Sequence, residues 1–338
     1  MQWIKIRGIL VKYLLVFMGI SIFLFTVFKF VPLKIVSNDF PGNSIKTMGI
    51  HKNIIFQYFY FLHSMLVGSV GYTYTPFYSG TVIRAVSITL PETVLFLISI
   101  FALSYTASYF IGLYSGTAFK TTKTLNMNIF PLLFFYLVSG IVLLSVFAGI
   151  LGWFPAHGIL SSSSTALNRW ISSTGNIIYI SRPTNIILLD SIIHSSPTVL
   201  LNFLNHIVLP FFSLFIPTTI YLSVYISHET SIEYNKAYMK AGITRNAFMD
   251  NYIIYIRRGI RSRVLKELKS VFVIFMGGMV IISYLFLYMN IGEFAIYSFL
   301  NYDYGIMGGI YSLFILAIMV IIFDLFIDVI NSGGKDEI

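Results

Sequence analysis

Residues 225–269 have the sequence YISHETSIEYNKAYMKAGITRNAFMDNYIIYIRRGIRSRVLKELK, a long charged stretch between two apolar ones. The pattern predicts two short helices, at 228–241 and at 244 to about 258, separated by a glycine. A compact helical pair of this kind is not needed to hold a chain in a bilayer. We therefore expect it to contact another component.

The predicted break lies at Gly242. A glycine there can adopt the left-handed conformation that ends a helix, and Ile243 would fold back onto Tyr238 as the apolar contact of the cap. Thr244 can then cap the second helix through its hydroxyl. The sequence thus predicts a helix–turn–helix unit centred on Gly242.

Composition indicates an all-α integral membrane protein. The 338-residue chain is 57% hydrophobic and 10% charged, whereas soluble domains contain about 25% charged residues. A spanning helix needs about 20 apolar residues, and four stretches without any Asp, Glu, Lys or Arg have room for one each. They lie between residues 123 and 169, 190 and 229, 269 and 293, and 303 and 324.

We predict six spans in a single transmembrane domain, 1–338. The spans are residues 9–31, 93–115, 130–153, 208–226, 271–288 and 306–330, and the chain ends are 1–8 and 331–338. Pro91 suits the first turn of the second span, and Glu92 would cap its start, where a helix favours a carboxylate. Pro217 is expected to kink the fourth span.

Basic residues predict the orientation. The loop at 227–270 holds nine of them, whereas the loop at 289–305 has none. The positive-inside rule therefore places 227–270 and both termini in the cytoplasm of a plasma or inner membrane. This placement explains the net charge of +9 better than nucleic-acid binding does. The nine basic residues are Lys236, Lys240, Arg245, Arg257, Arg258, Arg261, Arg263, Lys266 and Lys269.

Two long segments are predicted to lie outside. Residues 32–90 are rich in Tyr and Phe, typical of an interfacial belt, and Gly68, Gly71 and Gly80 are expected to break their structure. Residues 154–207 are predicted to form an extended loop with a helix near 199–205.

The charged loop resembles the EAA loop of ABC importers, and the whole chain resembles their permease subunits of the dipeptide/oligopeptide type. Tyr238 departs from the pattern, because the family usually has a small alanine there, and Ile260 replaces a common proline. The loop residues that fit are Glu233, Tyr234, Lys236, Ala237, Gly242, Ile243 and Arg245; further matching stretches are 90–93, 151–155, 206–210, 291–294, 301–304 and 324–325.

The resemblance implies a type I permease fold with a cytoplasmic coupling helix. It also implies four kinds of partner besides membrane lipid: a second homologous permease, two ATP-binding subunits that carry ATP and Mg, and an extracytoplasmic substrate-binding protein. The residues implied to contact the ATPase are Glu233, Tyr234, Ala237, Gly242, Ile243 and Arg245.

No catalytic residue, cofactor or metal site is expected in this chain. It has no cysteine, and its six histidines show no metal-ligand spacing. The stretch 333–336, Gly-Gly-Lys-Asp, lacks the upstream glycine and the hydroxyl of a phosphate-binding loop. Asp324 and Asp328, one turn apart, are interpreted as interfacial residues facing the basic loop.

Other interpretations remain open at this stage. The charged loop also fits a pair of basic helices lying on anionic headgroups. The chain would then be a stand-alone channel or secondary carrier, although its mid-span regions lack the ionisable residues that ion coupling uses. Within the importer class, the cargo could be peptides, oligosaccharides or nickel complexes.

Overall fold

The computed structural model describes residues 2–31, 53–75, 78–119, 128–161, 184–244, 252–300 and 305–333. Within these ranges, six helical segments are long and apolar enough to cross a membrane, which confirms a multi-pass, mainly helical membrane protein. Each expected span overlaps one of them. They are α1 (Gln2–Phe30), α5 (Val82–Phe119), α6 (Pro131–Leu143) continued by the π-helix η1 (Leu144–Ile150), α8 (Pro197–Tyr234), α10 (Tyr252–Leu285) and α12 (Ile306–Gly333).

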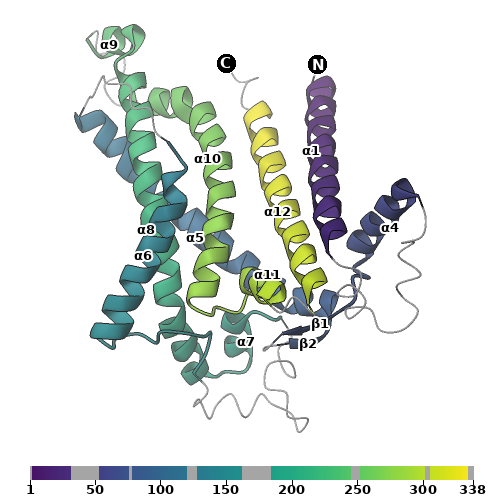
Figure 1. Ribbon diagram of the computed structural model, residues 1–338. Helices are drawn as coiled ribbons and strands as arrows, with labels where there is room; N and C mark the ends of the chain where they lie inside the picture. Colours follow the sequence, from purple (N-terminus) through teal and green to yellow (C-terminus); the bar gives the residue numbers. More distant parts are fainter. Residues whose placement is uncertain are drawn as a thin grey trace.

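Shorter elements lie at the two ends of this bundle (Figure 1). α9 (Ala237–Thr244), the start of α1 and the end of α12 share one end, which we call the basic end. The opposite end, the hairpin end, holds α7 (Ile187–Ile193), α11 (Ile291–Leu300) and the antiparallel strands β1 (Tyr72–Thr75) and β2 (Tyr78–Thr81). α4 (Ile54–Val67) packs beside α1.

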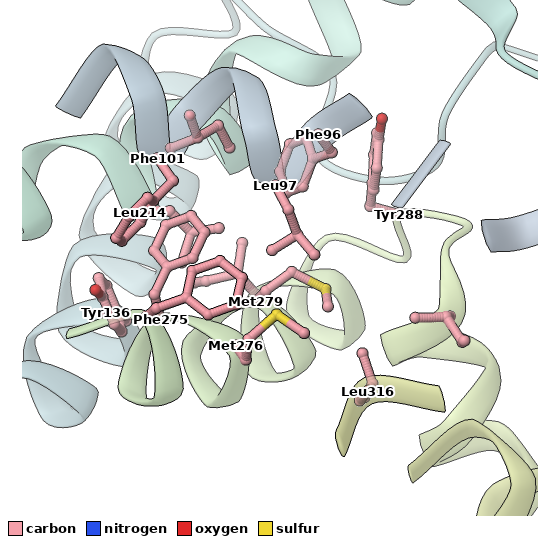
Figure 2. Packing of buried hydrophobic residues seen from close by; sticks show 14 of the residues in the cluster. Phe96, Leu97, Phe101, Tyr136, Leu214, Phe275, Met276, Met279, Tyr288 and Leu316 are labelled. Carbon is pink, nitrogen blue, oxygen red and sulfur yellow. The ribbon is translucent and has the colours of Figure 1, made fainter. Parts of the chain in front are cut away.

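The core forms where α5, α6, α8 and α10 meet. Phe275 on α10 contacts the rings of Phe101 on α5 and Tyr136 on α6, with centroid distances of 5.3 and 6.2 Å; Figure 2 shows these three side chains together. The hydroxyl of Tyr136 lies 2.8 Å from that of Thr218 on α8. A Cβ at Gly278 would stand 2.1 Å from the Tyr136 ring, so only glycine lets α6 approach α10 this closely.

α5 and α8 form the most extensive helix pair, because α5 presents small residues to α8. A Cβ at Gly112 would lie 2.6 Å from Ile226, and one at Gly116 would lie 2.5 Å from the carbonyl oxygen of Ser227. Ser231 donates a 2.9 Å hydrogen bond to the Gly116 carbonyl. A small residue at every fourth position is a standard means of close helix approach in membranes.

Several helices begin earlier than the sequence predicted. α5 starts at Val82, so Pro91 lies inside the helix and the prediction that it opens the span was wrong. The helix expected near 199–205 is the first part of α8, which begins at Pro197.

The glycine break predicted at Gly68 is confirmed, whereas Gly80 lies inside β2. Gly68 ends α4 with φ 79°, and Gly71 and Gly80 also have positive φ. α4 is held to α1 by a 2.7 Å hydrogen bond between the Tyr58 and Ser21 hydroxyls and by the packing of Phe61 on Phe25.

Candidate functional site

The chain turns between α8 and α9 at Asn235 and Lys236, not at Gly242. Asn235 donates from its side-chain amide to the carbonyl of Ser231 at 2.9 Å. The first hydrogen bonds of the next helix then begin at Lys236, whose carbonyl accepts from the backbone N–H of Lys240. Gly242 lies inside α9, so the predicted cap there was wrong. The backbone N–H of Asn235 donates to the same Ser231 carbonyl at 3.1 Å, so both donors of Asn235 meet the last turn of α8.

The start of α10 also differs from the prediction for the charged loop. It starts at Tyr252 and continues without interruption to Leu285, so the second short helix predicted at 244–258 is not separate from the fifth span. Thr244, the expected cap, is instead the last residue of α9. Gly259 and Ile260 lie within this continuous helix.

α9 is a two-sided helix at the basic end. Met239 is fully buried and belongs to the hydrophobic core, and Gly242 is also buried. Residues 237, 238, 240 and 241 are exposed. The buried side fixes α9 to the bundle, and the exposed side presents two alanines, a lysine and a tyrosine.

A ladder of polar contacts joins α8 to α10 behind α9. Tyr221 donates to Glu267 at 2.6 Å, and Tyr225 donates weakly to the Arg263 carbonyl at 3.5 Å. Arg263 binds Glu229 through Nε and Glu233 through Nη2, the latter at 2.8 Å. We call these residues, with Gly259, the α8–α10 ladder.

Glu233 is the centre of the ladder, with 1% of its side chain exposed. Besides Arg263, its carboxylate accepts from Lys236 at 2.8 Å and from the hydroxyl of Tyr238 at 2.5 Å. A Cβ at Gly259 would lie 2.3 Å from the Glu233 carboxyl carbon. The glycine therefore makes the space in which this carboxylate meets its three donors.

Tyr238 connects α9 to the ladder. Burial raises the pKa of its phenol to about 12, and the hydrogen bond to Glu233 adds to the shift. The phenol is therefore protonated at neutral pH and acts as the donor. A small alanine at this position would lack that link.

A second cluster at the basic end joins α1, α10 and α12. Asp328 binds Lys269 and Lys12, and accepts a 2.6 Å hydrogen bond from Tyr13. The interpretation of Asp328 as facing the basic loop is thus confirmed. Oδ1 of Asp324, one turn earlier, is buried with no hydrogen bond within the described residues.

A junction of polar residues closes the hairpin end. Glu92 accepts from the Tyr288 hydroxyl at 2.8 Å and from the backbone N–H of Ile187, the first residue of α7, at 3.0 Å. The prediction that Glu92 caps its own helix was therefore wrong; it caps α7. Thr93 accepts from the N–H of Ile291 at 2.9 Å, so the stretches at 90–93 and 291–294 meet in space.

The structure separates the six predicted coupling residues. Glu233 lies in the ladder, and Tyr234 ends α8 with its ring 6.4 Å from that of Tyr252 on α10. Ala237 and Gly242 lie on opposite sides of α9, and Ile243 is its penultimate residue. Arg245 lies outside the described residues.

Sequence reasoning missed the partners of Glu233, although a signal was present. The ladder residues recur every fourth position on both helices, which places them on one face of each. The α5 residues that approach α8 have the same spacing. The α8 series is 221, 225, 229 and 233, the α10 series is 259, 263 and 267, and the α5 series is 104, 108, 112 and 116.

No cluster of His, Asp or Glu suited to a metal ion occurs within the described part of the chain. The chain matches no protein-family model, and no curated protein matches it.

Proposed function

We propose that the chain is the permease subunit of an ATP-driven, binding-protein-dependent importer. It forms half of the translocation pathway and receives its driving motion at α9. The observation that carries the proposal is the placement of α9: a short helix at the bundle end, anchored by Met239 and tied through Tyr238 to the ladder. The motif resemblance of the same loop supports it.

The ladder makes this arrangement suited to transmitting a displacement. A push on α9 reaches α8 through the Asn235 turn and reaches α10 through Glu233 and Arg263. α8 is also packed tightly on α5 at Gly112 and Gly116. Packed helices move as rigid bodies rather than deforming continuously, so α5, α8 and α10 would shift together and reorient the passage.

The exposed side of α9 is the proposed contact with a cytoplasmic ATPase. Ala237 and Ala241 allow a close approach, and Lys240 adds positive charge. ATP and Mg would be bound by two such ATPase subunits, and a second homologous permease would complete the pathway. In this proposal the basic end faces the cytoplasm of the plasma or inner membrane, in accord with the positive-inside rule.

Peptides are the proposed cargo, since the motif resemblance is to the dipeptide/oligopeptide subfamily. Oligosaccharides and nickel complexes are the alternatives for the same machinery. The choice would be made largely by the extracytoplasmic binding protein, so binding assays on that protein with the three ligand classes test this part of the proposal.

The test of the importer proposal is purification of the tagged chain expressed with its neighbouring genes. We expect ATP-hydrolysing chains to co-purify and Ala241→Arg, on the exposed side of α9, to abolish both their retention and uptake. Ala118→Arg is the matched control, because it adds the same charge at an exposed position on a different helix, at the end of α5. Transport by the chain alone in liposomes would instead show a channel or secondary carrier.

A further inference from the structure

A second group of cations at the basic end has no role in the ladder. Arg257 and Arg261, one turn apart on α10, face two tyrosines one turn apart on α5. The Arg257 guanidinium lies 5.7 Å from the centroid of the Tyr109 ring. Arg261 on α10 and Tyr105 on α5 each lie one turn further towards the hairpin end. The two tyrosine rings contact each other at 5.7 Å. We call these four residues the Arg–Tyr cluster.

The cluster consists almost wholly of hydrogen-bond donors. Neither arginine has a carboxylate partner within the described residues; Arg261 makes one 3.5 Å contact, to the carbonyl of Ile330 on the last turns of α12. The hydroxyls of Tyr105 and Tyr109 make no hydrogen bond to any described residue. A guanidinium offers five N–H donors in a planar fork that fits phosphate. A set of donors of this kind is chemically suited to an anion.

The surroundings of the cluster are apolar. Phe323 on α12 contacts Phe101, one turn from Tyr105 on α5, at 5.4 Å. Phe323 also stacks at 3.9 Å on Phe272, which lies about three turns from Arg261 on α10. These three rings join α5, α10 and α12 further towards the hairpin end than the cluster. Large apolar side chains on the same three helices are exposed: Phe110 on α5, whose ring contacts that of Tyr109, Ile254 on α10 and Phe326 on α12. An anion bound here would lie next to surface that suits hydrocarbon.

We propose that the Arg–Tyr cluster binds the phosphate of an anionic phospholipid. Arg257 and Arg261 hold the phosphate oxygens, the hydroxyls of Tyr105 and Tyr109 donate to it, and the acyl chains lie along the exposed apolar side chains of α5 and α12. Arginines at a membrane boundary attract anionic headgroups. The donor set on two facing helices gives this site a defined geometry that scattered surface lysines lack.

The experiment uses the purified full-length chain in detergent. Phosphatidylglycerol, phosphatidylcholine and inorganic phosphate are added separately, and retention by native mass spectrometry is measured together with the thermal unfolding midpoint. We expect phosphatidylglycerol to be retained and to raise the midpoint, and the other two to do neither. Protection by inorganic phosphate alone, or equal retention of both lipids, would overturn the proposal.

The variants separate the site from general charge. Arg257→Gln with Arg261→Gln is expected to weaken phosphatidylglycerol binding at least tenfold, in line with hydrogen bonds to charged groups. Arg258→Gln is the control: it removes an equal charge at the adjacent exposed position and should change binding less than twofold. Tyr105→Phe with Tyr109→Phe leaves every charge in place and should weaken binding two- to tenfold. Equal loss in Arg258→Gln, or unchanged binding in the arginine and tyrosine pairs, would contradict the assignment.

Discussion

Gly259→Ala is the most informative perturbation of the ladder. The added Cβ would stand 2.3 Å from the carboxyl carbon and 2.5 Å from Oε1 of Glu233. Contacts this short require Glu233 to move, and its position is fixed by Arg263, Lys236 and Tyr238. The substitution therefore acts on the ion cluster without removing any of its members.

The magnitude follows from the burial of the pair. The Glu233 side chain is 1% exposed and that of Arg263 is 36% exposed. An exposed pair is worth up to about 1 kcal/mol, and breaking a buried pair costs about 3–5 kcal/mol, so we take about 2 kcal/mol for this half-buried one. Alanine gains about 1 kcal/mol over glycine in a helix. The net loss of unfolding free energy is then about 1 kcal/mol.

Gly277→Ala is the matched control on the same helix. A Cβ there meets only Leu133 at 3.5 Å, an ordinary contact, so the variant should gain about 1 kcal/mol from helix propensity. Denaturant titration in detergent micelles should thus separate the two variants by about 2 kcal/mol. In a Glu233→Ala background the separation should vanish. Equal stability of the two variants in the natural background would refute the reasoning.

Three further predictions concern other contacts. Gly116→Ala should lower the unfolding free energy by about 1–3 kcal/mol relative to Gly277→Ala in the same titration. The reason is that the added Cβ would lie 2.5 Å from the backbone oxygen of Ser227. An unchanged unfolding midpoint would contradict the close approach of α5 and α8. Glu92→Ala should lower the unfolding free energy by about 2–4 kcal/mol, and Tyr288→Phe by about 1 kcal/mol. The first variant removes the acceptor of two hydrogen bonds, whereas the second removes only one donor. Equal effects of the two variants would argue against the capping of α7. Ultraviolet titration of the natural chain, compared with Tyr238→Phe, should show the Tyr238 phenol ionising near pH 12 rather than 10. The contribution of this phenol to stability is then complete below pH 10 and is lost as the pH rises through 12. Ionisation near pH 10 would show that the hydrogen bond to Glu233 does not form.

Apolar length and charge placement were enough to predict the spans, because both reflect the cost of burying polar groups in hydrocarbon. Helix ends were harder to predict. Pro91 was taken as a first-turn residue, yet the preceding turns, from Val82 onward, extend the helix at the hairpin end. Gly242 was taken as a terminator, yet α8 ends at Tyr234 with Asn235 as its cap, and Gly242 lies inside α9. In both cases the sequence offered a plausible helix boundary, a proline or a glycine, at a position that the helix in fact includes.

The candidate site was predicted only in part. Glu233 was selected from the motif, but its partners Arg263 and Gly259 lie more than 25 positions away in the sequence. Their four-residue spacing indicates a shared helix face, but not which helix that face meets. The register between α8 and α10 is fixed by packing, so the ladder could be recognised only in the structure.

The most direct test of the account is cross-linking from the exposed side of α9. The chain contains no cysteine, so Ala241→Cys introduces a unique thiol, and Ala118→Cys at the end of α5 serves as the control. In native membranes we predict that a thiol-reactive photo-cross-linker at position 241, but not at 118, joins the chain to an ATP-hydrolysing subunit, with a yield that changes when ATP is added. Cross-links from position 241 to lipid alone would contradict the claim that α9 receives the driving motion.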